Sequence, residues 1–512
     1  MFASMEPVNS SASTYRFGTK MLLLLTVINL FNFLDRYVLS AVLEPIKADF
    51  GIESDADMGR LATGFMLGYF LTSPIFGYLG DKLSRRKLMA IGIVGWSLGT
   101  CLTGIAQGFS FMMFCRIMVG LGEASFGAIA PAVISDAFPS SKRNKAVTFF
   151  SLAIPLGAAF GFALGGIISA HLGWRSAFFI TGIPGFLLAL LLFFIPEPER
   201  GMNDVQEKKD KVSFKSIASL IKNKEYVYVN LGYIFYTFAM GAFSFWGPAF
   251  LYRVHWLNEA DASLFLGPSL VVGGIVGTLI GGALANRWRS KSPAGYAKLL
   301  VISMLFAVPF SFVSFLTENT LLSMICIAIS LVFLFQSTGP INTVILESVP
   351  YTMRATAMAI CIFLIHAFGD LWSPELVGSV SDQYVNSIKI KLTPEVISSN
   401  ESIGFSEVKQ DKLMYSMIKK EDVYKYRLDS SKNIYGNYEK FFIAQLSDKS
   451  KIDYYINRLN PDKRIKKLEK VGNLRIGMLI LPGAFLLAAI FWFFLYRVQR
   501  QKNEFPATAL PL

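Results

Sequence analysis

Residues 76–87 read FGYLGDKLSRRK. The first part of this stretch ends an apolar run that begins near residue 58, and the basic triplet at 85–87 precedes a second apolar run. A helix rises about 1.5 Å per residue, so it needs about 20 apolar residues to cross about 30 Å of hydrocarbon. Both flanking runs reach that length. The stretch therefore predicts two membrane-spanning helices joined by a short basic loop.

The same alternation of apolar runs and basic patches continues through the whole chain of 512 residues. Charged residues make up 17% of it and hydrophobic residues 53%, whereas soluble proteins carry about 25% charged residues. The net charge of +13 gathers at the ends of the apolar runs, which indicates membrane topology and not nucleic-acid binding. The predicted fold class is an all-α polytopic membrane protein with twelve transmembrane helices in two six-helix halves. The spans are expected near residues 20–43, 58–80, 88–108, 110–135, 144–170, 176–195, 226–252, 263–286, 297–316, 320–345, 355–379 and 474–496.

Lysine and arginine crowd the loops on one side of the predicted membrane and are nearly absent from the short loops on the other side. Because cytoplasmic loops carry this excess, both termini are expected in the cytoplasm. A weak repeat supports two halves, since G-x-x-x-D-K at 77–82 returns as G-x-x-x-N-R at 282–287. The predicted domains are a cytoplasmic N-terminal tail (1–19), a first half (20–195), a cytoplasmic linker (196–225), a second half (226–382 and 473–497), an exterior insertion (383–472) and a cytoplasmic C-terminal tail (498–512).

The insertion at 383–472 is polar and rich in Lys, Tyr, Ser and Asn. It follows the eleventh run, and eleven crossings from a cytoplasmic N-terminus place it outside the cell. It contains helix-compatible stretches such as SDKSKIDYYINRLNPDKRIKKLEK at 447–470. Two interpretations stay open: a small exterior subdomain or lid, or a decoration that takes no part in transport.

Ionisable side chains inside the apolar runs form the first candidate site. A charge at mid-bilayer costs about 2.5–3.5 kcal/mol on insertion scales, so each needs a reason. Asp35 and Arg36 are adjacent, point about 100° apart on a helix, and must find partners on other helices. The fourth run places Arg116 and Glu123 on one helix face, and Glu123 is expected near the membrane depth of Asp35. We expect the carboxylates of Asp35 and Glu123 to cluster with both arginines, for proton coupling and substrate contact or as a static network that holds the helices together.

The eleventh run holds a second candidate cluster. His366 and Asp370 stand four residues apart and share a helix face, with Ser373 one turn further on. Histidine titrates nearest to neutral pH, which suits proton coupling, although a lone histidine on an apolar face is often only a packed core residue. Pro374 is expected to break or kink this helix and to free a carbonyl.

The opening stretch also predicts a gate. We expect Gly77 to permit close packing and Asp81 to lie near the start of the next helix, while a basic triplet anchors the loop: Arg85, Arg86 and Lys87. Such a charge lock would close the cytoplasmic side in one state and release it in another, or the triplet would serve as plain interfacial anchoring. In the fifth run a smooth stripe predicts tight helix packing or sliding, with packing favoured: Gly157, Gly161 and Gly165.

The chain carries no motif of an enzyme. It lacks a Walker A sequence, an H-E-x-x-H metal motif and a G-x-S-x-G nucleophile with partners. The four cysteines all fall inside apolar runs and are expected to be core residues, not a disulfide framework or a zinc site: Cys101, Cys115, Cys326 and Cys361. We therefore expect no enzyme activity, no cofactor and no metal, with a proton as the coupling ion.

The twelve runs, the central basic linker and GYLGDKLSRRK resemble the major facilitator superfamily. The finer pattern is similar to its Spinster branch of lipid transporters, on stretches spread through both halves: 32–52 (NFLDRYVLSAVLEPIKADFGI), 116–138 (RIMVGLGEASFGAIAPAVISDAF), 151–166 (SLAIPLGAAFGFALGG), 173–185 (GWRSAFFITGIPG) and 365–382 (IHAFGDLWSPELVGSVSD). The resemblance implies alternating access, lysolipid transport, and proton linkage through Asp35, Arg36 and Glu123, with His366 also matching. Asn286, where the superfamily motif favours Asp, and the insertion at 383–472 depart from that pattern.

The predicted function is secondary active transport of a lysolipid by alternating access, linked to protons. The alternatives are proton-linked transport of a small organic anion or drug on the same fold and, from a different class, passive lipid scrambling. We expect a monomer in the plasma membrane or a bacterial inner membrane, with an endolysosomal membrane as the alternative. The expected partners are the bilayer and a lipid or small-molecule substrate, with no nucleic acid.

Overall fold

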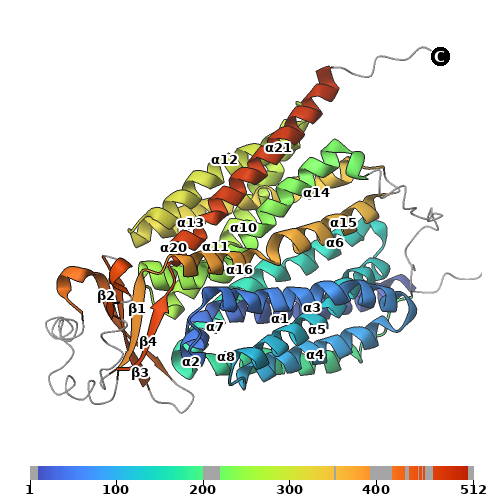
Figure 1. The fold of residues 1–512 in the computed structure, drawn as a ribbon. Helices are drawn as coiled ribbons and strands as arrows, with labels where there is room; N and C mark the ends of the chain where they lie inside the picture. Colours follow the sequence, from blue (N-terminus) through green and yellow to red (C-terminus); the bar gives the residue numbers. More distant parts are fainter. Residues whose placement is uncertain are drawn as a thin grey trace, which may run out of the picture.

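The architecture is that of a computed structural model, shown in Figure 1. The structure describes residues 10–199, 220–350, 353–392, 418–432, 438–447, 449–452, 454–455 and 465–504. The tail before residue 10, most of the predicted linker, parts of the insertion and the end of the C-terminal tail lie outside these residues.

The first half of the bundle is built from helices that occupy the first six predicted spans. The fifth crossing is made of α6 and α7, which meet at a one-residue break. The helices are α1 (Ser10–Ala41), α2 (Leu43–Phe50), α3 (Asp55–Lys82), α4 (Arg85–Gly104), α5 (Phe109–Ala137), α6 (Ser140–Ser151), α7 (Ala153–Leu172) and α8 (Trp174–Leu192).

The second half repeats this arrangement. Its fourth crossing joins α13 to α14, its fifth joins α15 to α16 through a π-helical turn, and its sixth joins α20 to α21. The elements are α10 (Lys224–His255), α11 (Glu259–Arg289), α12 (Gly295–Leu316), α13 (Thr320–Phe335), α14 (Thr338–Glu347), α15 (Arg354–Ile365), the π-helix η2 (His366–Asp370), α16 (Ser373–Gln383), α20 (Leu474–Met478) and α21 (Ile480–Glu504).

Eleven helical segments of the described chain are long and apolar enough to cross a membrane. Helix α3 is not among them, because Asp and Arg occupy its first two turns and Gly, Ser and Thr are frequent along it. It nevertheless packs lengthwise against α5 inside the bundle, which makes it the twelfth crossing. Side-chain caps start several of these helices: Ser54 accepts from Asp57 N at α3, and Ser84 accepts from Lys87 N at α4.

Three helix pairs make the most extensive contacts between the halves. Helix α3 packs on α16, α7 packs on α11, and α1 contacts α10. Figure 1 shows the helices running in similar directions, with a β-sheet at one end and the C-terminus at the other. We call these the sheet end and the terminal end of the bundle.

The insertion forms a four-stranded antiparallel sheet in the order β2-β3-β1-β4. The strands are β1 (Ser387–Leu392), β2 (Val423–Lys432), β3 (Tyr438–Leu446) and β4 (Ile465–Val471). The helix-compatible interpretation is therefore wrong for the end of 447–470, because Ile465 and Leu468 pair with Leu392 and Ile390 of the central strand β1. Pairing with a strand distant in the sequence thus overrides a local spacing that is typical of a helix.

The eleventh crossing breaks where Pro374 predicts it. Helix α15 ends at Ile365, a π-turn covers His366–Asp370, and α16 starts at Ser373 with the proline in its first turn. The Ser373 hydroxyl donates to the Asp370 carbonyl at 3.4 Å, and that carbonyl is the one that the proline leaves without a backbone N–H.

Candidate functional site in the centre of the bundle

Helices α1 and α5 bring two of the four predicted charges of the first half into direct contact. The guanidinium of Arg36 donates through Nη2 to Glu123 Oε2 at 2.6 Å. The Glu123 side chain is fully buried, whereas the Arg36 side chain is 26% exposed. The ion pair thus joins two neighbouring helices, with the carboxylate buried and the guanidinium partly exposed.

Aromatic rings enclose this pair. The Arg36 Cζ atom lies 4.9 Å from the ring centre of Phe33, 4.8 Å from that of Phe65 and 5.5 Å from that of Tyr69. Arg116 Cζ lies 5.4 Å from the Phe65 ring, so both guanidinium groups lie close to this phenyl ring. Rings at these distances stabilise a cation without neutralising it.

Asp35 lies near Glu123 and Arg116 but makes no direct ion pair with Arg116. Its carboxylate is buried at 1% exposure and accepts from the Thr100 hydroxyl at 3.4 Å, and no ion pair within 4 Å reaches it among the described residues. Its Oδ1 atom and two nitrogens of the buried Arg116, Nε and Nη1, have no hydrogen-bond partner in the described part of the chain. The expected four-membered cluster is therefore one direct pair, Arg36–Glu123, with two buried charges beside it.

The second predicted cluster lies on the π-turn. His366 Nδ1 is 3.0 Å from Asp370 Oδ2 and 3.1 Å from Oδ1, so the two side chains contact one another as their spacing indicates. Both side chains are part-exposed, at 30% and 22%. Tyr69 interacts electrostatically with both Arg36 and Asp370, which places it between the two clusters.

These two clusters define the candidate site. Ionisable groups in the middle of helices that cross a membrane generally face the interior of the bundle and not the lipid. A buried carboxylate such as Glu123 can exchange its arginine partner for a proton, and the released guanidinium can then hold an anionic group.

The basic loop of the first half binds partners from its own half. Arg85 forms a buried ion pair with Asp136 at the end of α5, and its Nε atom donates to the Gly80 carbonyl at 3.3 Å. The backbone N–H of Arg85 donates to Glu197 Oε1 at 2.9 Å, while Arg86 Nη1 donates to two carbonyls that follow α8. Lys87 is exposed. The loop is thus fastened to its own half, and the side chain of Asp81 lies outside the described set.

The second half carries a counterpart of this arrangement. Arg289, at the end of α11, pairs with Glu347 at the end of α14 at 3.0 Å, and both groups are exposed. The two pairs occupy corresponding places in the two halves, although the sequence repeat had pointed to Asn286 and Arg287 instead.

Two sets of glycines behave differently. A Cβ atom at Gly157, Gly161 or Gly165 would lie 2.5–2.9 Å from atoms of α1, so this stripe permits the close packing of α7 on α1. A Cβ atom at Gly77 would meet nothing within 4 Å, so the expectation of close packing there is wrong for this conformation. The same open space surrounds Gly282 and Gly339 of the second half.

Sequence reasoning missed the acidic partners Asp136, Glu197 and Glu347, because each stands at the end of an apolar run and there resembles an interfacial charge. It also missed a charge network at the sheet end, which joins Lys47, Asp55 and Arg253. The one sequence feature that could have indicated this network is the Ser54-Asp55 pair at the start of α3. Within the described residues, no group of three or more His, Cys, Asp or Glu side chains is placed to hold a metal ion.

Comparisons with known proteins agree with this architecture. Residues 25–374 match the family model of the Major Facilitator Superfamily. The chain is 33% identical to protein spinster homolog 1 of Xenopus tropicalis over 392 residues, which cover 72% of this chain and 74% of that protein. It is 32% identical to the sphingosine-1-phosphate transporter of Danio rerio, over 70% of this chain and 75% of that protein.

A plant relative and a solved structure extend the comparison. The probable sphingolipid transporter spinster homolog 1 of Arabidopsis thaliana is 30% identical, over 71% of this chain and 82% of that protein. A bacterial homologue of the human lysosomal transporter Spinster, solved in an inward-facing and unoccupied conformation, has a TM-score of 0.72 at 22% identity and covers 95% of this chain and 98% of that chain. The predicted fold class and the predicted absence of enzyme activity are confirmed. The chain belongs to the major facilitator superfamily and, within it, to the Spinster family of membrane transporters.

Proposed function

We propose that this protein is a secondary active transporter that moves a lysolipid by alternating access, linked to protons. The observation that carries the proposal is the Arg36–Glu123 pair, in which a fully buried carboxylate faces a part-exposed guanidinium at 2.6 Å. The buried Arg116, with two nitrogens unpartnered among the described residues, supplies further donors for an anionic headgroup. The rings of Phe33, Phe65 and Tyr69 beside Arg36 suit an amphiphile that carries both a charge and an apolar chain.

Proton linkage follows from competition at Glu123. In the ionised state Glu123 holds Arg36, and in the protonated state it releases Arg36 for the substrate. Asp35, which has no ion pair in the described structure, is the second carboxylate that could carry a proton. The family relationship supports this interpretation, because two relatives are named as transporters of sphingolipids or of sphingosine-1-phosphate.

The proposal includes an orientation. The terminal end, with its basic loops, would face the cytoplasm, and the sheet would face the exterior of a plasma membrane or bacterial inner membrane. A monomer suffices for this mechanism, because both clusters come from one chain.

Uptake into proteoliposomes tests the function. Labelled lysophosphatidylcholine, lysophosphatidylethanolamine or sphingosine-1-phosphate is offered with and without an inward proton gradient. Wild type should respond to the gradient, and Asp35→Asn and Glu123→Gln should lose the response while keeping their size-exclusion profile. Absence of lipid flux in a folded wild type would reject the lipid and direct a screen of small organic anions. Gradient-independent flux that both variants retain would favour scrambling.

A further inference from the structure

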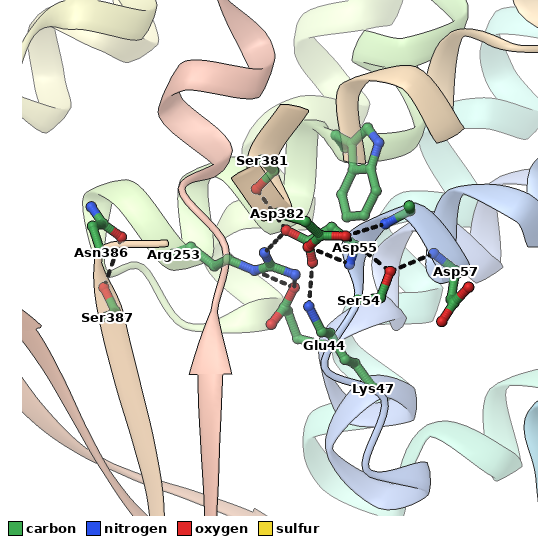
Figure 2. A network of polar contacts seen from close by, with 12 residues as sticks. Glu44, Lys47, Ser54, Asp55, Asp57, Arg253, Ser381, Asp382, Asn386 and Ser387 are labelled. Carbon is green, nitrogen blue, oxygen red and sulfur yellow. Dashed lines mark hydrogen bonds and ion pairs between the residues drawn. The ribbon is translucent and has the colours of Figure 1, made fainter. Parts of the chain in front are cut away.

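The sheet end of the bundle holds a network of charged groups that none of the predicted sites includes. We define the sheet-end latch as six residues from both halves: Glu44, Lys47 and Asp55 of the first half, and Arg253, Ser381 and Asp382 of the second (Figure 2). We propose that this latch closes the sheet end during transport, that it must open in each cycle, and that the inserted sheet is attached directly to it. The proposal rests on alternating access as proposed above.

Asp55 is the centre of the latch. Its carboxylate is fully buried and forms ion pairs with Lys47 of its own half and with Arg253 Nη1 of the second half, the latter at 2.7 Å. It also accepts from the Ser381 hydroxyl at 2.7 Å. Arg253 reaches a second carboxylate of the first half, Glu44, at 2.5 Å. One arginine of α10 therefore clamps two acidic residues of the opposite half.

Asp382 adds a helix cap that crosses between the halves. Its Oδ1 atom accepts from Asp55 N at 2.8 Å, and its Oδ2 atom accepts from Ala56 N at 3.0 Å and from the Ser54 hydroxyl at 2.9 Å. A carboxylate at a helix N-terminus satisfies free N–H groups and complements the helix dipole. The last turn of α16 thus caps α3, and rotation of the halves apart at this end would expose those N–H groups.

Both ends of the insertion meet at the latch. Ser381 and Asp382 lie just before the insertion, and the backbone N–H of Asn473, just after it, donates to the Ser381 carbonyl at 3.0 Å. A Cβ atom at Gly472 would lie 2.5 Å from Asp55 Oδ2, so the returning chain passes directly over the central carboxylate. A pocket between the sheet and the bundle is lined by Glu44 and Arg253 on one side and by Asn386 and Gln445 on the other.

These contacts belong to one conformation. At the terminal end, Gly77 of the first half and Gly282 of the second face open space, whereas at the sheet end Gly59 would place a Cβ atom 2.6 Å from the backbone of Glu375. The halves are thus in close contact at the sheet end, and no such contact reaches Gly77 or Gly282 at the terminal end. An opposite state must break the contacts of Arg253 and Asp382 to the first half, so these residues set the balance between the two states.

Distances between spin labels test the latch. The four native cysteines are replaced by serine or alanine, and labels are placed on Glu53 and Glu318 for the sheet end and on Leu83 and Lys291 for the terminal end. Asp382→Ala should shift the population by at least about tenfold towards a longer sheet-end distance and a shorter terminal-end distance, because it removes three hydrogen bonds to a charged group. Asp261→Asn is the control, since Asp261 stands in the first turn of α11 at the sheet end and, among the described residues, its side chain and backbone N–H bond to Asn258 at the start of the same helix.

The outcomes separate the latch from the transport mechanism. Unchanged distances in Asp382→Ala would overturn the latch, even if wild type still shifts with substrate or pH. If the label distances in wild type stay the same under all conditions while those in Asp382→Ala differ, the latch is supported and alternating access is rejected. A Ser54→Cys/Asp382→Cys pair gives a second test, because cross-linking it should stop transport and a reductant should restore it. Full transport with the cross-link in place would overturn the proposal.

Discussion

At the scale of single residues, the ion pair between Arg36 and Glu123 is the contact whose loss should cost the most stability. Sequence spacing placed Asp35, Arg36, Arg116 and Glu123 in the membrane and excluded pairing between neighbours on one helix. It could not tell which arginine takes which carboxylate, because that depends on the rotation of α1 against α5. Helix rotation is set by packing, including the glycines of α7 that allow α1 to approach.

Arg36→Leu should destabilise the protein by about 3–5 kcal/mol, because it leaves the fully buried Glu123 without its counter-charge. The Arg36→Leu/Glu123→Leu double variant should recover most of that loss, because it removes the uncompensated charge. Thermal unfolding in detergent micelles measures both. Strict additivity of the two single variants would show that the residues do not act as a pair.

Among the elements, the glycine stripe of α7 makes the clearest prediction. Gly161→Ala should lower the melting temperature, because its Cβ atom would lie 2.5 Å from the Leu34 carbonyl oxygen, a backbone atom that cannot move aside. The cost is about 1–3 kcal/mol of unfolding free energy. Gly77→Ala, in open space, is the control and should leave the melting temperature unchanged. Equal effects at the two positions would refute the packing role of the stripe.

The inserted sheet makes a prediction about pH. Hydrogen bonds from Lys451 and Tyr455 hold the pKa of Asp422 below its usual range. A carboxyl group whose pKa is lower in the folded state stabilises the fold above its unfolded pKa of about 3.9, and this contribution is lost as the pH falls below that value.

The hydrogen-exchange rate of the described strands, corrected for its intrinsic pH dependence, should therefore stay constant from neutral pH to about pH 5. It should rise below about pH 4. Tyr455→Phe should move this rise to higher pH, because it removes one donor to Asp422. An unchanged midpoint in Tyr455→Phe would mean that another group governs the transition.

The strands of the insertion mark the limit of sequence reasoning for elements. The apolar helices were predictable because membrane crossing imposes length and composition together. The segment Ile465–Val471 was not, because its three apolar residues stand three positions apart, a spacing typical of a helix. Its strand state depends on pairing with β1, more than seventy residues earlier.

For the whole molecule, the open space around Gly77 predicts how transport could be stopped without unfolding. Gly77→Leu should leave the melting temperature near that of wild type and abolish uptake, because a bulky side chain would prevent the halves from meeting at the terminal end. Gly282→Leu should act in the same way from the second half. If folded Gly77→Leu retains uptake, the halves do not meet at the position of Gly77 during transport.

The order of spans and the two halves were predictable from the chain, and so was the break at Pro374. The conformation was not, because under the proposed mechanism the same sequence satisfies two arrangements of its halves, and the contacts of only one appear in a given structure. Charged residues that hold one state, such as Asp55 and Arg253, look in the sequence like ordinary interfacial anchors.

The short distance between the two ends of the insertion has a consequence for its history and for engineering. The Ser381 carbonyl and the Asn473 N–H are hydrogen-bonded at 3.0 Å, so the chain leaves and re-enters the bundle at almost one point. A module with adjoining termini can be gained, lost or exchanged in evolution without changing the path of the surrounding helices. The same site would accept a grafted fluorescent protein, whose emission would then report each opening of the transporter in a living cell.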